Sequence, residues 1–202
     1  MSASATIDFY FDYSSPYAYL ASHTIEALAQ KHGRTVTWRP ILLGFVFKTT
    51  DSKPLVHIPL KGDYSMHDLK RTARETGVPF VIPDNFPIGT VAAARATLWV
   101  RANHADKTDA LVHALFNAYF GNNTDISDTA NVLQIAGTCG IDASPLEQAL
   151  GDNDVKALLK TEVDNALNAG VFGAPFMVVD GEPFWGHDRL PVIDRWLSTG
   201  GW

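Results

Sequence analysis

The 202-residue chain has a single cysteine, Cys139, so an intrachain disulfide is excluded. Cys139 stands between Thr138 and Gly140, where a helix is expected to end. A lone cysteine in that position is typical of a small buried apolar residue rather than of a nucleophile. The chain also lacks a glycine-rich phosphate loop and the motifs HExxH, CxxC and GxSxG, and its seven histidines show no metal-binding spacing. We therefore expect no metal site.

Positive charge is scarce, with 16 lysines and arginines against 22 acidic residues and a formal net charge of −6. No run of basic residues occurs, which argues against nucleic acid or an anionic membrane surface as a partner. Any anionic ligand must then be met locally, by a helix end or a single cation. No apolar stretch is long enough to span a bilayer, and Met1 to Thr6 carry no export signal. Together with the lone cysteine, these absences predict a cytoplasmic protein.

What is present is a packed globular composition, with 46% hydrophobic and 19% charged residues. The chain opens on a strand pattern, because apolar and polar residues alternate from Thr6 to Phe11. An amphipathic helix follows, for which Ser15 is a fitting N-cap and Pro16 a fitting first residue. A second strand is expected over 35–41, so the opening predicts a strand–helix–strand unit with a parallel pair. By itself this stretch favours Ser15 as a helix cap over Ser15 as part of an anion site.

Helical patterns dominate from about Ser65 to Gly170. They predict helices over 65–76, 90–103 and 108–120, one that begins at Ser127 or Asp128, one that begins with the capping box 144–147, and one over 154–168. The apolar residues 42–47 show no clear period, and 51–63 has the composition of an exposed connection. Strand signals return at 175–179 and 182–185, joined by the turn residues Asp180-Gly181, and a short helix is expected over 190–197.

Two late segments also have functional interpretations. A cis Ala174-Pro175 bond would expose the backbone of Ala174 to the main chain of a ligand, although the plain interpretation is a linker into a strand. Asp188 is placed to cap the last helix, where unpaired N–H groups could hold a carboxylate. Aromatic residues such as Tyr13, Tyr17, Phe45 and Phe47 could wall an apolar pocket, though such aromatics are usually core.

Taken together, these pieces resemble the 2-hydroxychromene-2-carboxylate isomerases, which belong with the kappa-class glutathione transferases in the DsbA-like thioredoxin-fold group. The resemblance covers nearly the whole chain. It rests on Phe11-Asp12-Tyr13-Ser14-Ser15-Pro16-Tyr17-Ala18-Tyr19-Leu20, Lys61-Gly62-Asp63-Tyr64 with Asp68, Leu69 and Arg71, Pro83-Asp84-Asn85, Val171-Phe172-Gly173-Ala174-Pro175-Phe176, and Phe184-Trp185-Gly186-His187-Asp188-Arg189-Leu190.

The resemblance implies a site for glutathione. Ser15 takes the place of the residue that contacts the glutathione sulfur, which in oxidoreductase relatives is the first cysteine of CxxC. Here the four positions read Ser15-Pro16-Tyr17-Ala18, so both redox thiols are absent and disulfide exchange is removed. A hydroxyl at a helix N-terminus remains, which suits the stabilisation of a bound thiolate.

Other family positions carry over to this chain as well. Ala174, before a cis Pro175, is implied to pair main chain to main chain with the cysteinyl part of glutathione, and His187 and Asp188 to meet its γ-glutamyl end. Position 187 is more often a small polar residue in relatives, so His187 departs from the family pattern. Lys61, Tyr64 and Asn85 are implied to lie at the mouth of the site, where Lys61 could meet a carboxylate of glutathione or of an aromatic acid. Considered alone, Lys61 is an ordinary solvated lysine.

The fold expected from this resemblance is α/β, with a DsbA-like, thioredoxin-like core at 1–45 and 171–202 and a mainly helical insertion domain at 46–170. The expected function is glutathione-dependent isomerisation of a small aromatic substrate, with glutathione thiolate as a transient nucleophile. The alternatives are a kappa-type transferase that conjugates electrophiles, and a non-catalytic module that binds glutathione or a peptide. The resemblance also implies a homodimer, for which the sequence shows no interface.

Overall fold

The computed structural model describes residues 6–202 of the chain. The expectation about an export signal rests mainly on residues 1–5, which lie outside the described residues, as does the start of the predicted segment 1–45. No helix within 6–202 is both long enough and apolar enough to cross a membrane.

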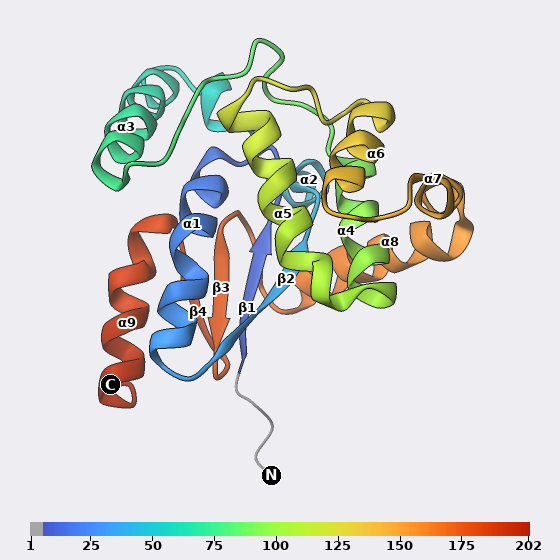
Figure 1. Ribbon diagram of the computed structural model, residues 1–202. Helices are drawn as coiled ribbons and strands as arrows, with labels where there is room; N and C mark the ends of the chain where they lie inside the picture. Colours follow the sequence, from blue (N-terminus) through green and yellow to red (C-terminus); the bar gives the residue numbers. More distant parts are fainter. Residues whose placement is uncertain (1–5) are drawn as a thin grey trace.

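A four-stranded mixed sheet with the order β2-β1-β3-β4 forms the centre of the fold (Figure 1). Its strands are β1 (Thr6–Phe11), β2 (Thr35–Pro40), β3 (Phe176–Val179) and β4 (Glu182–Trp185). β1 and β2 pair in parallel, which confirms the predicted strand–helix–strand unit, whereas β3 runs antiparallel to β1 and to β4. Asp180 and Gly181 both have positive φ in the turn of the predicted hairpin, as a two-residue turn of the primed type requires.

Helices account for most of the remaining chain. They are α1 (Pro16–Lys31), α2 (Leu43–Thr50), α3 (Lys61–Thr76), α4 (Val91–Asn103), α5 (Thr108–Phe116), α6 (Thr129–Thr138), α7 (Ala143–Gly151), α8 (Asn153–Asn168) and α9 (Leu190–Thr199). Short 3₁₀ turns stand at η1 (Leu55–His57), η2 (Ala105–Lys107) and η4 (His187–Arg189), and a π-helical turn, η3 (Asn117–Gly121), continues α5. In Figure 1, α1 and α9 lie side by side, while α2 to α8 stand between β2 and β3 in the chain.

Two local predictions need correction, and one open segment is now assigned. The segment 42–47, for which the sequence predicts no structure, is mostly helical, because α2 begins at Leu43. The capping box at Ser144 is wrong: Asp142 caps α7 by accepting the N–H of Ser144, so Ser144 lies inside the first turn. Asp188 does not cap α9, because a 3₁₀ turn comes first and Arg189, without a side-chain hydrogen bond, holds the cap position.

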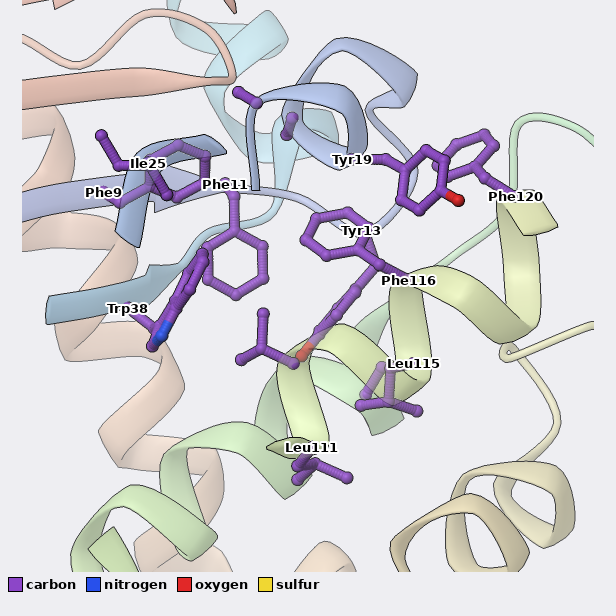
Figure 2. Close-up of a cluster of buried hydrophobic side chains, with 14 of the residues drawn as sticks. Phe9, Phe11, Tyr13, Tyr19, Ile25, Trp38, Leu111, Leu115, Phe116 and Phe120 are labelled. Atoms are coloured by element: carbon purple, nitrogen blue, oxygen red, sulfur yellow. The ribbon is translucent and has the colours of Figure 1, made fainter. Parts of the chain in front are cut away.

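A large hydrophobic core joins the sheet to most of the helices, and two smaller clusters include buried residues of α8. Figure 2 shows Phe11, Tyr13, Trp38 and Phe116 gathered between β1, β2 and α5, and all four are at most 2% exposed. The ring centroid of Phe11 lies 5.0 Å from that of Tyr13, 5.7 Å from that of Trp38 and 5.4 Å from that of Phe116. Each such side chain contributes about 1.5–3 kcal/mol by burial. This core holds the end of β1, and with it the following turn, against α5. The division at residues 45 and 171 stays a prediction.

Candidate active site

Ser15 occupies the turn between β1 and α1. It is the N-cap of α1, and its Oγ accepts the N–H of Ala18 at 3.2 Å, as the sequence predicts for a hydroxyl followed by proline. The same hydroxyl donates its proton to the backbone carbonyl of Ala174, at 2.9 Å. Ser15 is 5% exposed. This hydroxyl thus joins the turn before α1 to the loop before β3.

A buried carboxylate, Asp12, holds this turn in place. It accepts the backbone N–H of Ser14 at 2.9 Å, that of Leu43 at 2.7 Å, and the hydroxyl of Thr90 at 2.7 Å. Burial raises the pKa of Asp12, and these three hydrogen bonds act in the opposite direction. Asp12 therefore ties the Ser15 turn to the first turn of α2 and to the residue before α4. The sequence signal for this role of Asp12 is weak, because it consists only of an acidic residue between an apolar strand and a helix cap.

Ala174 lies directly before a cis Pro175, in agreement with the functional interpretation of that segment. Pro175 O accepts the N–H of Gly186 at 3.0 Å, which holds the loop against the start of η4. The N–H of Ala174 has no acceptor within residues 6–202, and the residue is partly exposed. Ala174 therefore offers one backbone donor toward solvent.

A cavity of about 730 Å³ opens beside Ser15 and Ala174. Its walls are mainly apolar and come from α2, the connection 51–58, α3 and the loop before α4; they include Leu43, Phe47, Leu55, Met66, Leu69 and Phe86. Within the described chain, the charged side chains of this lining are Asp51 and Lys53. A cleft of this size and composition suits an aromatic body with a few polar groups that orient it. Lys53 was missed in the sequence, because the segment 51–63 shows only the features of an exposed connection.

Tyr17 links the cavity to α3 and η4. Its hydroxyl donates to Asp68 at 2.9 Å, and its ring stacks on that of His187 with centroids 5.5 Å apart. Burial, and then the hydrogen bond to Asp68, raise the pKa of Tyr17, so this phenol stays protonated at neutral pH. Arg71 also binds Asp68. These contacts fix α3, which forms one cavity wall, against the first turn of α1.

The structure brings some of the predicted site residues together and leaves others apart. Ser15 and Ala174 border the cavity, Pro175 follows them, and His187 approaches only through its stack on Tyr17. Lys61 is exposed and does not line the cavity, although it lies one helical turn before Ser65, a lining residue. Three more predicted residues also lie outside the lining: Tyr64 is 63% exposed against Arg71, Asn85 donates to Asp125 at 2.8 Å, and Asp188 pairs with Arg189 at 3.2 Å.

The aromatic residues considered for a pocket wall divide in the same way. Tyr17 and Phe47 line the cavity, whereas Tyr13 is buried in the core and Phe45 is 57% exposed. Within residues 6–202, no group of three or more histidine, cysteine or acidic side chains is arranged to hold a metal ion.

Known proteins share this architecture. A family model described as a DSBA-like thioredoxin domain matches residues 6–198. A 2-hydroxychromene-2-carboxylate isomerase from Sphingobium xenophagum is 31% identical over 194 residues, which cover 95% of this chain and 97% of the relative. The human glutathione S-transferase kappa 1 is 25% identical over 210 residues, which cover 96% and 93% of the two chains.

The solved structures agree with these relatives. A selenomethionine structure of 2-hydroxychromene-2-carboxylate isomerase superimposes with a TM-score of 0.87 at 28% identity, covering 96% of this chain and 95% of that one. These matches confirm the predicted DsbA-like, thioredoxin-like α/β fold. The chain belongs to the DSBA-like thioredoxin-domain family, in the group formed by the 2-hydroxychromene-2-carboxylate isomerases and the kappa-class glutathione transferases.

Proposed function

We propose that this protein is a glutathione-dependent isomerase of aromatic compounds similar to 2-hydroxychromene-2-carboxylate. The observation that carries the proposal is the position of the Ser15 hydroxyl, at the N-terminus of α1, beside Ala174 and on the wall of a mainly apolar cavity. The names of the relatives support both the reaction class and the thiol cofactor. The chain has no second cysteine for a dithiol reaction, and in this proposal the nucleophile is the thiolate of bound glutathione.

The residues present fit glutathione. Ala174 has a backbone N–H without an acceptor in the described chain, and its carbonyl faces Ser15, so the residue can pair with the cysteinyl main chain. Ser15 and the N-terminus of α1 favour a thiolate over a thiol at this point. When bound there, glutathione would supply a thiolate, the nucleophile for reversible addition to a conjugated carbon of the substrate.

The remaining site residues have roles at the rim in this proposal. His187 and Asp188 meet the γ-glutamyl end, His187 with its ring held by Tyr17. Lys61 binds a carboxylate at the mouth, and Tyr64 and Asn85 contact the substrate there. The apolar walls formed by α2, α3 and Phe86 hold the aromatic body and exclude water around it.

The test is conversion of 2-hydroxychromene-2-carboxylate, followed by absorbance, with and without glutathione. We expect turnover only when glutathione is present, and an unchanged glutathione concentration when the reaction is complete. Conversion at the same rate without glutathione, or none with it, contradicts the proposal. Consumption of glutathione with release of a conjugate favours the second candidate, a kappa-type transferase, to which the match with the human kappa 1 enzyme points.

A second prediction separates the two cations near the cavity. Lys53 lines the cavity, whereas Lys61 lies outside its lining. We therefore expect Lys53→Met to raise KM for the aromatic acid and Lys61→Met to raise KM for glutathione. Because both side chains are exposed, each effect is about two- to fivefold, with kcat unchanged. Steady-state kinetics with each reactant varied in turn provide the measurement. If both KM values stay at the wild-type level in both variants, neither lysine binds a carboxylate.

A further inference from the structure

The Ser15 hydroxyl has one proton, and that proton is already used. It is donated to Ala174 O at 2.9 Å, while the oxygen accepts the N–H of Ala18 at 3.2 Å. A hydroxyl in this state caps α1 and ties it to the loop before β3, but it has no proton left for a sulfur atom. To stabilise a thiolate, Ser15 must first release Ala174.

Release of the Ala174 carbonyl has a cost, because this partly buried oxygen loses its hydrogen bond. Ser15 is the donor that the described chain provides to Ala174 O. The N–H of the same residue has no acceptor within 6–202, so Ala174 can pair with an extended chain through both of its backbone groups. A ligand N–H that reaches Ala174 O replaces the serine proton, and the carbonyl stays paired.

We propose that the cysteinyl N–H of the thiol ligand switches Ser15 from Ala174 to the sulfur. The ligand N–H takes over Ala174 O, the Ser15 hydroxyl turns while it still accepts from Ala18, and its proton then meets the thiolate; the thiol proton passes to solvent. This inference rests on the proposed function and adds a rule for the ligand. The site activates thiols carried on a peptide-like residue with its own N–H, and it leaves simple thiols unactivated.

The test compares glutathione with two ester analogues in which oxygen replaces one amide N–H. The first analogue lacks the cysteinyl N–H, and the second lacks the glycyl N–H and serves as the matched control. The pKa of the bound thiol is read from thiolate absorbance during a pH titration of the protein–ligand complex. We expect glutathione and the glycyl ester to show a bound thiol pKa about one pH unit lower than the cysteinyl ester does, the size of one charge-assisted hydrogen bond.

An analogue that binds too weakly to saturate the protein can be tested by its second-order rate constant, which is measured below saturation. The rate constants of the wild type and Ser15→Ala with each of the two ligands then form a double-mutant type of cycle. With an activated chloronitrobenzene as electrophile, Ser15→Ala should slow the glutathione reaction about tenfold, which corresponds to one pH unit in the thiol pKa, and the cysteinyl ester reaction less than about threefold. Equal losses with both ligands, or equal bound thiol pKa values for both esters, overturn the switch. Failure of glutathione activation, on which the proposed function depends, has a different signature: the wild-type protein then leaves the thiol pKa of glutathione itself unchanged.

Discussion

Replacement of Ser15 by alanine should lower kcat/KM for glutathione-dependent turnover about tenfold at neutral pH, because the bound thiol loses the donor that lowers its pKa by about one pH unit. The hydroxyl is the side-chain donor closest to the helix N-terminus that borders the cavity. The same change removes a cap and the bond to Ala174 O, which together stabilise the fold by about 1–2 kcal/mol. The variant should therefore fold and bind glutathione while it fails to ionise the thiol.

The controls for this variant come from the same helix. Ser22→Ala removes a buried hydroxyl that donates to Tyr19 O at 2.7 Å, away from the cavity, and should keep wild-type turnover. Ser15→Thr keeps the hydroxyl and should recover most of the activity. Stopped-flow turnover and thermal unfolding of the wild type and the three variants provide the measurements. If Ser15→Ala folds and keeps wild-type activity, the Ser15 hydroxyl has no role in the reaction.

Local patterns were enough to predict the parts of the site that local sequence determines. A strand of alternating residues, a hydroxyl and then proline predict the position of Ser15 at the start of α1, and Asp180-Gly181 predicts the β3–β4 hairpin. The resemblance to a family then indicated that Ser15 and Ala174 belong to one site. Their hydrogen bond joins residues 159 positions apart, a contact that no periodicity reports.

The cavity wall was less predictable, for physical reasons. The connection 51–60 contains one 3₁₀ turn and no repeating face, so its composition indicates only exposure, yet Lys53 and Leu55 from it line the cavity. Asp12 likewise has its partners on three separate elements, and only the folded chain shows that its carboxylate is surrounded by donors. The error at Ser144 has a simpler cause. Asp142, two residues earlier, is also a good N-cap residue, and its carboxylate accepts the backbone N–H of Ser144.

A second long-range cluster, centred on Glu162 of α8, holds the helices against the edge of the sheet. The carboxylate accepts two hydrogen bonds from Arg101 of α4, at 3.1 and 3.0 Å, and one from Arg39 of β2, at 3.2 Å. Glu162 is 7% exposed. Burial by itself would raise the pKa of Glu162, but the hydrogen bonds and charges of Arg101 and Arg39 outweigh it and hold that pKa below its usual range.

We expect Glu162→Gln to lower the free energy of unfolding at pH 7 by about 3 kcal/mol, because it leaves two partly buried guanidinium groups without their shared anion. The matched control is Asp164→Asn on the same helix, where the carboxylate is exposed and pairs with Lys160; that change should cost less than about 0.5 kcal/mol. Urea denaturation of the three proteins gives both values.

The pH dependence of this difference follows from the direction of the pKa shift. The pKa of Glu162 is lower in the folded than in the unfolded chain, so the ionised carboxylate stabilises the fold fully above the unfolded value of about 4.3. That stabilisation is lost as the pH falls through the folded value, where wild-type Glu162 becomes neutral like glutamine. The stabilities of the wild type and Glu162→Gln should therefore converge in acid. A difference that stays constant from pH 7 down to acid unfolding would mean that Glu162 acts through its shape and packing, and that its charge contributes nothing to the junction of β2, α4 and α8.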